Sequence, residues 1–457
     1  MTPPPFSHPA FRGRFGVCRR EISPPPGIYS RNWGAAKSDI ATGLHRPMTL
    51  TALTLCGGEG SGPLAIISLD LGWWRGDEEE SVLAQAVREA GIAEGHFLLA
   101  LSHTHAGPNF CPAESHKPGG EHIRGYLQFL AGQIRDAVRQ ALASAVPGIL
   151  ETASGRCGLA ANRDLPDPQA SRLLVGWNPE IPADDTLLVG RISGADGSCL
   201  ATLVNYACHP TILAWQNTAI SPDYVGAMRE TIEAGTSAPC LFLQGASGEL
   251  APRHQYTGDT AVADRAGRSL GHAALGVLHG MLEPGHELVF QGAVESGASL
   301  AVWDTRPRTA VPEDITVLSA DIQLPLKEGF PEAGEIERQI ACCADRVLAE
   351  RLQRRLLNRR ALGPGTSVRR GHVFWRTGGI VFLALQDEIY SAFQTALRES
   401  AGEVPVLIST VTNSSRGYLA PRDSYTAKSY ASEQSPYAAG SFELVRETLT
   451  AELRKLL

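Results

Sequence analysis

The stretch that decides the fold is FLLALSHTHAGP, residues 97–108. Its first five residues are all apolar, which is typical of a short buried strand, and the polar residues that follow indicate where that strand ends. Side chains two residues apart in an extended segment point to the same side, so His103 and His105 can converge on one ion or one substrate. The Ala-Gly-Pro that follows favours a turn, which exposes the pair at a sheet edge where binding sites commonly lie. The alternative is two loop histidines that only hydrogen-bond the backbone.

Strand-like and helix-like runs alternate on both sides of this stretch. Apolar runs predict strand pairs at 49–55 with 64–71, around the turn-rich residues 57–63, and at 187–192 with 200–207. Helical spacing and apolar runs predict further helices (77–90, 125–145, 261–282, 333–362, 389–399 and 440–456) and further strands (241–243, 288–294, 315–324, 372–375, 380–385 and 406–411). Because hairpins and helical crossovers both occur, we predict an α/β fold with mixed β-sheets flanked by helices.

The domain organisation follows from the absence of a clear break in this pattern. We expect an N-terminal extension over residues 1–14 and a single large catalytic domain over residues 15–457. The Pro- and Arg-rich residues 305–312 are the best candidate for a linker, and a domain boundary near 284–312 is the alternative.

Composition excludes several classes of protein. The 457 residues are 43% hydrophobic and 19% charged, which is typical of a soluble folded chain. The 41 basic and 48 acidic side chains give a net charge of -7, which disfavours nucleic-acid binding. No run approaches the ~20 apolar residues of a membrane span. Prolines interrupt the first residues where a secretory signal needs an apolar run, and the nine cysteines form no C-x-x-C, so we expect a cytoplasmic protein with reduced thiols.

A second motif, NYACHPT at residues 205–211, also leads from a strand into polar residues. His209 lies where the strand stops, because Pro210 cannot donate to a ladder. Asp223, in ISPDYVG at residues 220–226, opens a helix soon afterwards. That carboxylate either caps the helix or orients a ligand imidazole, and its spacing favours capping.

A third motif is FLQGASGELAP, residues 242–252, a strand followed by a loop of small residues. It is not a serine nucleophile elbow, because Glu249 stands where the second glycine of that motif belongs. Backbone N–H groups that approach an oxyanion are the functional interpretation of this loop, and a tight turn is the alternative.

Two more motifs lie in the last fifth of the chain. LALQDEIY, residues 383–390, places Asp387 and Glu388 at a strand-to-helix junction. TNSSRGY, residues 412–418, leads into a loop that carries further tyrosines at 425, 430 and 437. Taken singly, an acid at a helix start and tyrosines in a loop are ordinary features.

Together and in this order, the five motifs resemble the catalytic domain of the neutral/alkaline (non-lysosomal) ceramidase family. FGV at 15–17, ISPP at 22–25 and GLHRP at 43–47 extend the resemblance, which covers about residues 15–445. By matched position it implies a zinc ion held by four ligands: His103, His209, Glu388 and Tyr430, with Tyr437 as the alternative phenol. It also implies that His105 handles a proton or contacts the transition state, and that Arg163, in the family's N-R motif, faces the active site.

The sequence departs from the family at three places. Ala251 stands at the position of the family's proposed active-site serine, Gln386-Asp387 precedes Glu388, and Ala431 follows Tyr430. Two imidazoles, a carboxylate and a phenol nevertheless suit zinc, which lowers the pKa of bound water towards ~7 and polarises a carbonyl without any serine.

The resulting hypothesis is a zinc-dependent hydrolase that cleaves a linear N-acyl amide of a small-molecule or lipid-like substrate. Two alternatives stay open: a catalytically inactive binding module, and a zinc-dependent esterase or hydrolase of carbohydrate derivatives that uses the same site.

Overall fold

The apolar runs of the sequence pair into a large mixed sheet. The computed structural model describes residues 3–58 and 62–457. Its eight-stranded sheet has the order β13-β11-β10-β6-β1-β3-β4-β5, in which β4–β5 and β11–β13 are parallel and the other pairs antiparallel. In chain order these strands are β1 (Ala10–Glu21), β3 (Thr49–Cys56), β4 (Leu64–Leu69), β5 (Phe97–Leu101), β6 (Val146–Arg156), β10 (Thr186–Gly194), β11 (Cys199–Tyr206) and β13 (Cys240–Gln244).

A smaller sheet packs face to face on the large one. It has the order β17 (Ile315–Pro325), β18 (Ser367–Thr377), β19 (Ile380–Leu385) and β21 (Val406–Ser409). One buried apolar cluster joins the two sheets and contains Phe11 and Phe15 of β1 together with Trp375, Phe382 and Leu407 of the small sheet. Burial of these large side chains between the sheets supplies the apolar free energy that holds them together.

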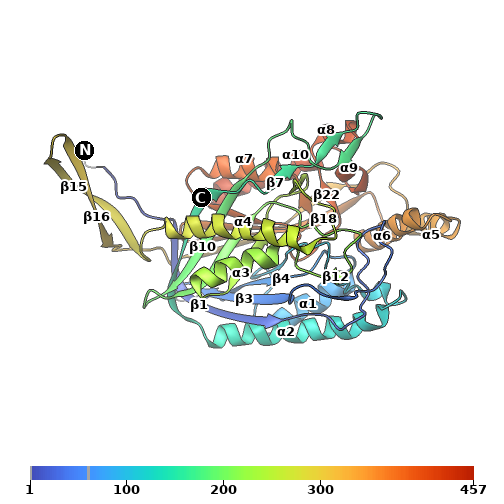
Figure 1. The fold of residues 1–457 in the computed structure, drawn as a ribbon, viewed down its shortest axis with the longest axis horizontal. Coiled ribbons are helices and arrows are strands. Elements are labelled where there is room, and N and C mark those ends of the chain that lie inside the picture. Colours follow the sequence, from blue (N-terminus) through green and yellow to red (C-terminus); the bar gives the residue numbers. More distant parts are fainter. Residues whose placement is uncertain (1–2, 59–61) are drawn as a thin grey trace.

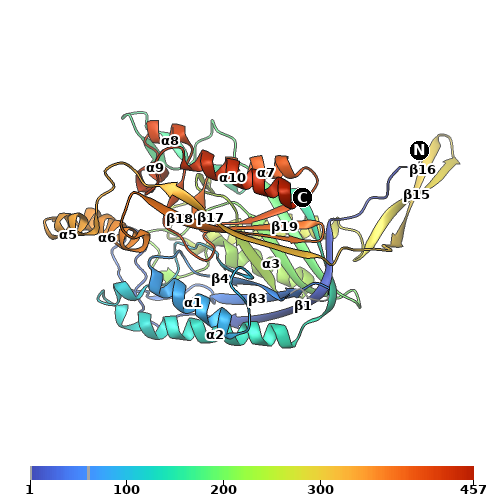
Figure 2. The same cartoon turned by 180° about the vertical axis from the view of Figure 1, so that it is seen from behind.

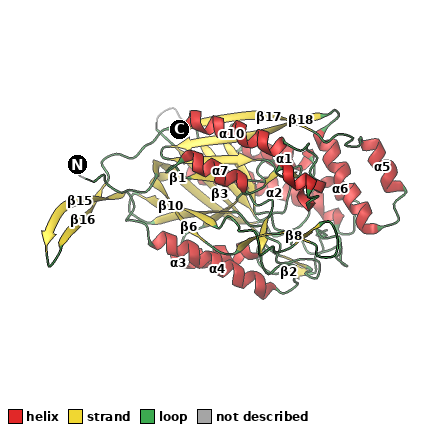
Figure 3. Cartoon of the chain, turned by 90° about the horizontal axis from the view of Figure 1, so that it is seen from above, coloured by secondary structure: helices red, strands yellow, loops and turns green. Residues whose placement is uncertain are grey.

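Helices cover both outer faces, which gives four layers (Figures 2 and 3). Apolar faces of α1 (Asp77–Glu89) and α2 (Ile123–Ala143) pack on one part of the large sheet, and α3 (Tyr224–Thr236) and α4 (Thr260–His279) on another. The small sheet is covered by α7 (Ala392–Ala401) and α10 (Ser441–Leu456). The predicted α/β fold, a single large domain of mixed sheets flanked by helices, is therefore confirmed.

Two features project from opposite ends of this body (Figure 1). One is the antiparallel hairpin β15 (His286–Glu295) and β16 (Ser299–Pro307), and the other is the helix pair α5 (Ala333–Ala341) and α6 (Arg346–Leu362). The helix predicted over 333–362 is thus two helices, because Asp345 caps a new start by accepting from the backbone N–H of Leu348.

Strands on either side of the alternative domain boundary near 284–312 share one buried apolar core. Residues 305–307 of the expected linker lie in β16. The large sheet also begins earlier than residue 15: β1 starts at Ala10, and Phe11 is fully buried. Residues 10–14, assigned by sequence to the extension, are therefore part of the sheet.

The predicted strand pairs are present as β3–β4 and β10–β11, although residues 59–61 of the expected turn lie outside the described residues. Within residues 3–58 and 62–457, no helix combines the length and the apolar character needed to span a bilayer.

The remaining elements are short. The strands are β2 (Gly43–Leu44), β7 (Ala160–Asn162), β8 (Asp164–Pro166), β9 (Leu173–Val175), β12 (Ala219–Ile220), β14 (Leu250–Pro252), β20 (Glu388–Ile389) and β22 (Tyr418–Leu419), and the short helices include α8 (Arg422–Thr426) and α9 (Tyr430–Gln434).

Candidate functional site

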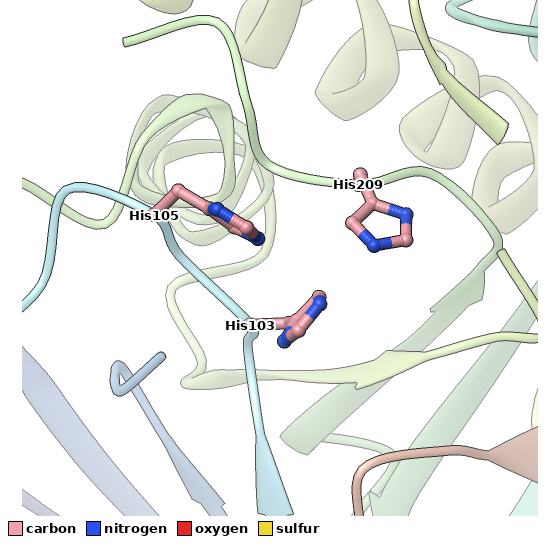
Figure 4. A group of neighbouring side chains, drawn as sticks. All are labelled: His103, His105 and His209. Carbon is pink, nitrogen blue, oxygen red and sulfur yellow. The ribbon is translucent and has the colours of Figure 1, made fainter. Parts of the chain in front are cut away.

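Three histidines meet where the chain leaves β5 and β11 (Figure 4). The large sheet curls so far that its two ends approach each other, since Ser68 of β4, next to the edge strand β5, donates to the carbonyl of Phe242 in the other edge strand, β13, at 2.9 Å. The ends of β5 and β11 are thereby brought together. The ring of His103 lies 4.8 Å from that of His209 and 5.1 Å from that of His105, and their candidate ligand nitrogens all fall within 4.8 Å of one another.

Backbone hydrogen bonds fix which ring nitrogens carry protons. Nδ1 of His103 lies 3.1 Å from the carbonyl of Gly72, and Nδ1 of His209 lies 2.7 Å from the carbonyl of Ser247. A carbonyl only accepts, so each Nδ1 is the donor and each neutral ring keeps a bare lone pair on Nε2. Both Nε2 atoms face one carboxylate oxygen, Oε2 of Glu388, at 3.3 Å for His103 and 2.9 Å for His209.

The charges at the site follow from burial. Burial, reinforced by the Arg163 guanidinium, lowers the pKa of His209 to about 3. Burial and the two neighbouring imidazoles hold the pKa of His105 well below its usual range. Burial raises the pKa of Glu388, but positive charge at the His103 and His209 positions outweighs burial, so this pKa lies well below its ordinary value and the acid is ionised. With both rings neutral, a bound cation would have to supply that positive charge.

This arrangement fits a metal ion. Nε2 of His103 and Nε2 of His105 are buried without a hydrogen-bond partner among the described residues. The Nε2 lone pairs of His103 and His209 also point at the anionic oxygen of Glu388, which is unfavourable unless a cation lies among them. Imidazole nitrogens whose other N–H is held by a backbone carbonyl are the usual form of a metal-binding histidine.

Tyr418 is the phenol that the structure brings to this cluster. β20 and β22 are parallel and pair Glu388 with Tyr418, whose hydroxyl hydrogen-bonds Glu388. Burial, and then the charge of Glu388, raise the pKa of Tyr418 well above its ordinary value. Tyr430 packs edge-on against the Tyr418 ring at 5.9 Å, one ring further from the cluster. Tyr437 instead donates to Asp387 at 2.8 Å.

Sequence reasoning passed over Tyr418 because it concentrated on the tyrosines further along the loop. The position of Tyr418 in the sequence is the signal that could have identified it. Tyr418 follows the polar run 412–417 at the end of a buried strand, as the histidines do after β5 and β11. No single-sequence pattern, however, reveals the two-residue strand pairing with Glu388.

Arg163 also reaches the cluster, as the sequence predicts. Its Nη2 donates to the carbonyl of Gly248 at 2.8 Å and to the Tyr418 hydroxyl at 3.3 Å, and lies 3.2 Å from Nε2 of His209. His105 lies on the opposite side, with its ring 4.8 Å from Trp73 and 5.4 Å from Trp33. Both residues therefore border the space in front of the candidate ligands.

The loop of the third motif supplies structure around the cluster. Ala251 is buried in β14 opposite Ala161 of β7. Glu249 accepts from Ser391, both from its backbone N–H at 2.9 Å and from its hydroxyl, and burial raises the pKa of Glu249 to about 7. Ser247 is engaged by Gln244, whose side-chain amide donates to it at 2.6 Å.

Asp223 caps α3, as its spacing predicts. Its carboxylate accepts from the backbone N–H of Tyr224 at 2.7 Å and from that of Leu213 at 2.8 Å. The alternative, that Asp223 orients a ligand imidazole, is not supported, because Asp223 hydrogen-bonds no histidine among the described residues.

A cavity of about 810 Å³ opens in front of the cluster. Its lining includes five residues of the cluster and its surroundings: His103, His105, Arg163, Glu388 and Tyr418. Much of the remaining wall is aromatic or comes from α6, including Trp33, Trp73, Trp215, Tyr256, Phe330, Val347, Leu348 and Leu352. A cavity with an apolar wall and a few convergent polar groups is the usual form of a small-molecule site.

Comparison with known proteins identifies the fold. No family model and no curated protein matches the sequence. Among solved structures, the chain is similar to the crystal structure of neutral ceramidase from Pseudomonas aeruginosa, with a TM-score of 0.69 and 17% identity over 98% of this chain and 74% of that one. It is similar to a ceramidase complexed with C2, with a TM-score of 0.68 and 17% identity over 98% and 76% of the two chains. The resemblance seen in the motifs is thus confirmed at the level of the fold.

Proposed function

We propose that this chain, which has the neutral ceramidase fold, is a zinc-dependent hydrolase of linear N-acyl amides that acts in the cytoplasm on a small-molecule or lipid-like substrate. One observation carries the proposal. Two buried imidazole nitrogens, each with its proton placed on the far side of the ring, face the same ionised carboxylate oxygen at 3.3 and 2.9 Å. A divalent cation is the ligand that relieves this contact.

The ligands that we assign are His103, His209 and Glu388, with a phenol as the fourth. Contact with Glu388 favours Tyr418 for that place over Tyr430, the residue expected from the sequence. Nitrogen and oxygen donors of this kind suit zinc. Zinc bound there supplies a Lewis acid that polarises a carbonyl and makes water more acidic.

The chain's own residues then position and stabilise the reacting groups. Arg163, held by the carbonyl of Gly248, places N–H donors beside the cluster, where they stabilise negative charge that develops on the substrate oxygen. His105 is neutral, and its buried Nε2 has no hydrogen-bond partner among the residues that the structure describes, so it can take a proton and pass it to the leaving amine. The indoles of Trp33 and Trp73 hold the His105 ring between the cluster and the cavity wall.

Ala251 does not contradict this proposal. Hydrolysis by activated water requires no serine nucleophile, and Ala251 lies in the short β7–β14 pairing. The binding-only and esterase alternatives use the same residues, so turnover must separate them.

The test is metal analysis of purified protein combined with turnover of N-acyl amides and matched esters. We expect about one zinc per chain, amide cleavage that a chelator abolishes, and loss of both metal and activity in His103→Ala and His209→Ala. His116→Ala, at an exposed histidine remote from the cluster, is the matched control and should keep both. Native protein without stoichiometric divalent metal would contradict the metal site. Bound zinc without turnover of any substrate would support the inactive binding module. Cleavage of esters but not of amides would support the esterase.

A further inference from the structure

One wall of the cavity is formed by the projecting helix α6, and this wall combines apolar residues and three arginines with one acid, Glu350. Val347, Leu348 and Leu352 line the cavity together with two arginines further along the helix, Arg354 and Arg355. Arg351 adds a third guanidinium to the same wall. Such a surface matches an amphiphile that carries a hydrocarbon part and a negative charge.

The arginines of α6 divide into two groups. Those outside the cavity are paired: Arg346 lies 3.4 Å from Glu350, Arg360 lies 2.8 Å from Glu337, and Arg359 forms an ion pair with Glu332. The three that line the cavity form no ion pair with any carboxylate among residues 3–58 and 62–457. Glu350, the nearest acid along the helix, is already held by Arg31 at 2.7 Å. The unpaired cations are therefore the ones that face the cavity.

Arg354 is the most deeply placed of the three. Among the described residues, its guanidinium makes one hydrogen bond, from Nη2 to the carbonyl of Asn32 at 3.0 Å. Burial, and then the nearby Arg75, lower its pKa. A half-buried cation with so few partners is unfavourable in the folded state, and a bound anion would offset this.

The distance from Arg354 to the candidate ligands is bridged by one indole. Its Cζ lies 5.9 Å from the centre of the Trp73 ring, and the same indole lies 4.8 Å from the ring of His105 and 6.1 Å from that of His103. A substrate whose amide reaches the cluster can therefore present a group on the same molecule to Arg354.

We propose that Arg354, supported by Arg351 and Arg355, binds an anionic group of the substrate, so that the enzyme acts on acidic N-acyl amides of the N-acyl amino acid class. This inference rests on the proposed function. Arginine binds carboxylates through paired N–H donors, and the apolar residues of α6 accept the acyl chain. In the reaction the amide C–N bond breaks, a C–O bond to water forms, and the amine takes up a proton, which yields a fatty acid and a free amino acid.

A ladder of substrates with one acyl chain tests the proposal. N-lauroylglycine, N-lauroyl-β-alanine and N-lauroyl-γ-aminobutyrate move the carboxylate outward step by step, and N-lauroylethanolamine is the neutral reference. We expect the best acid of this series to exceed the neutral amide by at least about tenfold in kcat/KM, the size of one charge-assisted contact. Arg354→Gln should remove that advantage mainly through KM, leave the neutral amide within about twofold, and be partly rescued by Arg354→Lys. Arg360→Gln, on the same helix but outside the cavity, should change neither.

A structural role for Arg354 would give a different result. If the guanidinium serves binding, Arg354→Gln should unfold at the same temperature as the wild type or higher, because a half-buried charge that has no carboxylate partner among the described residues is removed. Equal loss of activity on acidic and neutral amides, or a preference for the neutral amide, would overturn the proposal.

The proposed function can fail separately. If the zinc-loaded wild type cleaves no amide, the anionic subsite can still be tested by measuring the binding of N-lauroylglycine to chelator-treated protein by calorimetry. Binding about tenfold weaker in Arg354→Gln than in the wild type supports the anionic subsite, and equal binding in both rejects it.

Discussion

Asp387 and Glu388 are neighbours in the chain, yet they occupy opposite environments. Asp387 is surrounded by donors: Nε and Nη2 of Arg370 at 2.9 and 3.1 Å, the Tyr437 hydroxyl at 2.8 Å and the backbone N–H of Arg416 at 2.8 Å. Glu388 faces Nε2 of two imidazoles and accepts a hydrogen bond from the neutral hydroxyl of Tyr418. A carboxylate that holds a fold together is enclosed by hydrogen-bond donors, whereas one that faces acceptors marks the place of a ligand.

The largest effect that we expect is loss of stability in Asp387→Asn. This change leaves Arg370 buried without its carboxylate, which typically costs about 3–5 kcal/mol. Urea unfolding measures it, and any protein that folds should still bind zinc. Unchanged stability with lost metal would break the comparison, because Asp387 would then belong to the metal site.

Glu388→Gln should have the opposite effect to Asp387→Asn: it should keep stability and lose zinc binding and activity. The amide can donate to an imidazole Nε2, so the metal-free protein keeps its free energy of unfolding within about 1 kcal/mol. Loss of a ligand should lower zinc affinity and amide turnover by more than about 100-fold, since even outer partners of metal ligands are worth 10–100-fold. Zinc titration and turnover assays test this, and full activity in the variant would contradict it.

Comparing Tyr418→Phe with Tyr430→Phe tests which tyrosine belongs to the group around Glu388. Because only Tyr418 hydrogen-bonds Glu388, its removal should reduce zinc affinity and turnover by about tenfold. Tyr430→Phe should change both by less than about threefold. The opposite ranking would restore Tyr430 as the ligand expected from the sequence.

Glu249 is a third buried acid, and its expected effect is the smallest. Its pKa of about 7 exceeds the ordinary value of 4.5, so between these pH values the native state binds more protons than the unfolded chain. Its contribution to stability is present in full below pH 4.5 and is lost as the pH rises through about 7. Glu249→Gln should flatten the fall in unfolding temperature between pH 5 and 8. Glu79 and Asp223, with pKa values of about 7 as well, keep part of the slope.

Much of the fold could be predicted, because its core strands are local apolar runs. β5 and β19 have the predicted bounds, and the strand pairs β3–β4 and β10–β11 are present. β6 was not predicted, since partly exposed polar residues interrupt its apolar pattern. The break between α5 and α6 was not predicted either, because it depends on a single capping residue, Asp345.

The site divides in the same way. His103, His105 and His209 stand out because polar residues follow buried strands, and the structure brings all three together with Glu388 and Arg163. Tyr418 could not be selected, because its place depends on pairing with a strand thirty residues away. The three unpaired arginines of α6 were equally invisible, since the sequence alone does not tell which charges lack partners.

The core shared by the two sheets has a consequence for biosynthesis. It joins Phe11 to Leu407, and the side chains that meet at the cluster come from positions 103, 209 and 388. No early portion of the nascent polypeptide can assemble the pocket, so under the proposed function ion capture would follow emergence of the last sheet from the ribosome, and contacts so remote in sequence form slowly. Acquisition of the ion would therefore report completed folding, and a prematurely terminated product would neither retain it nor act.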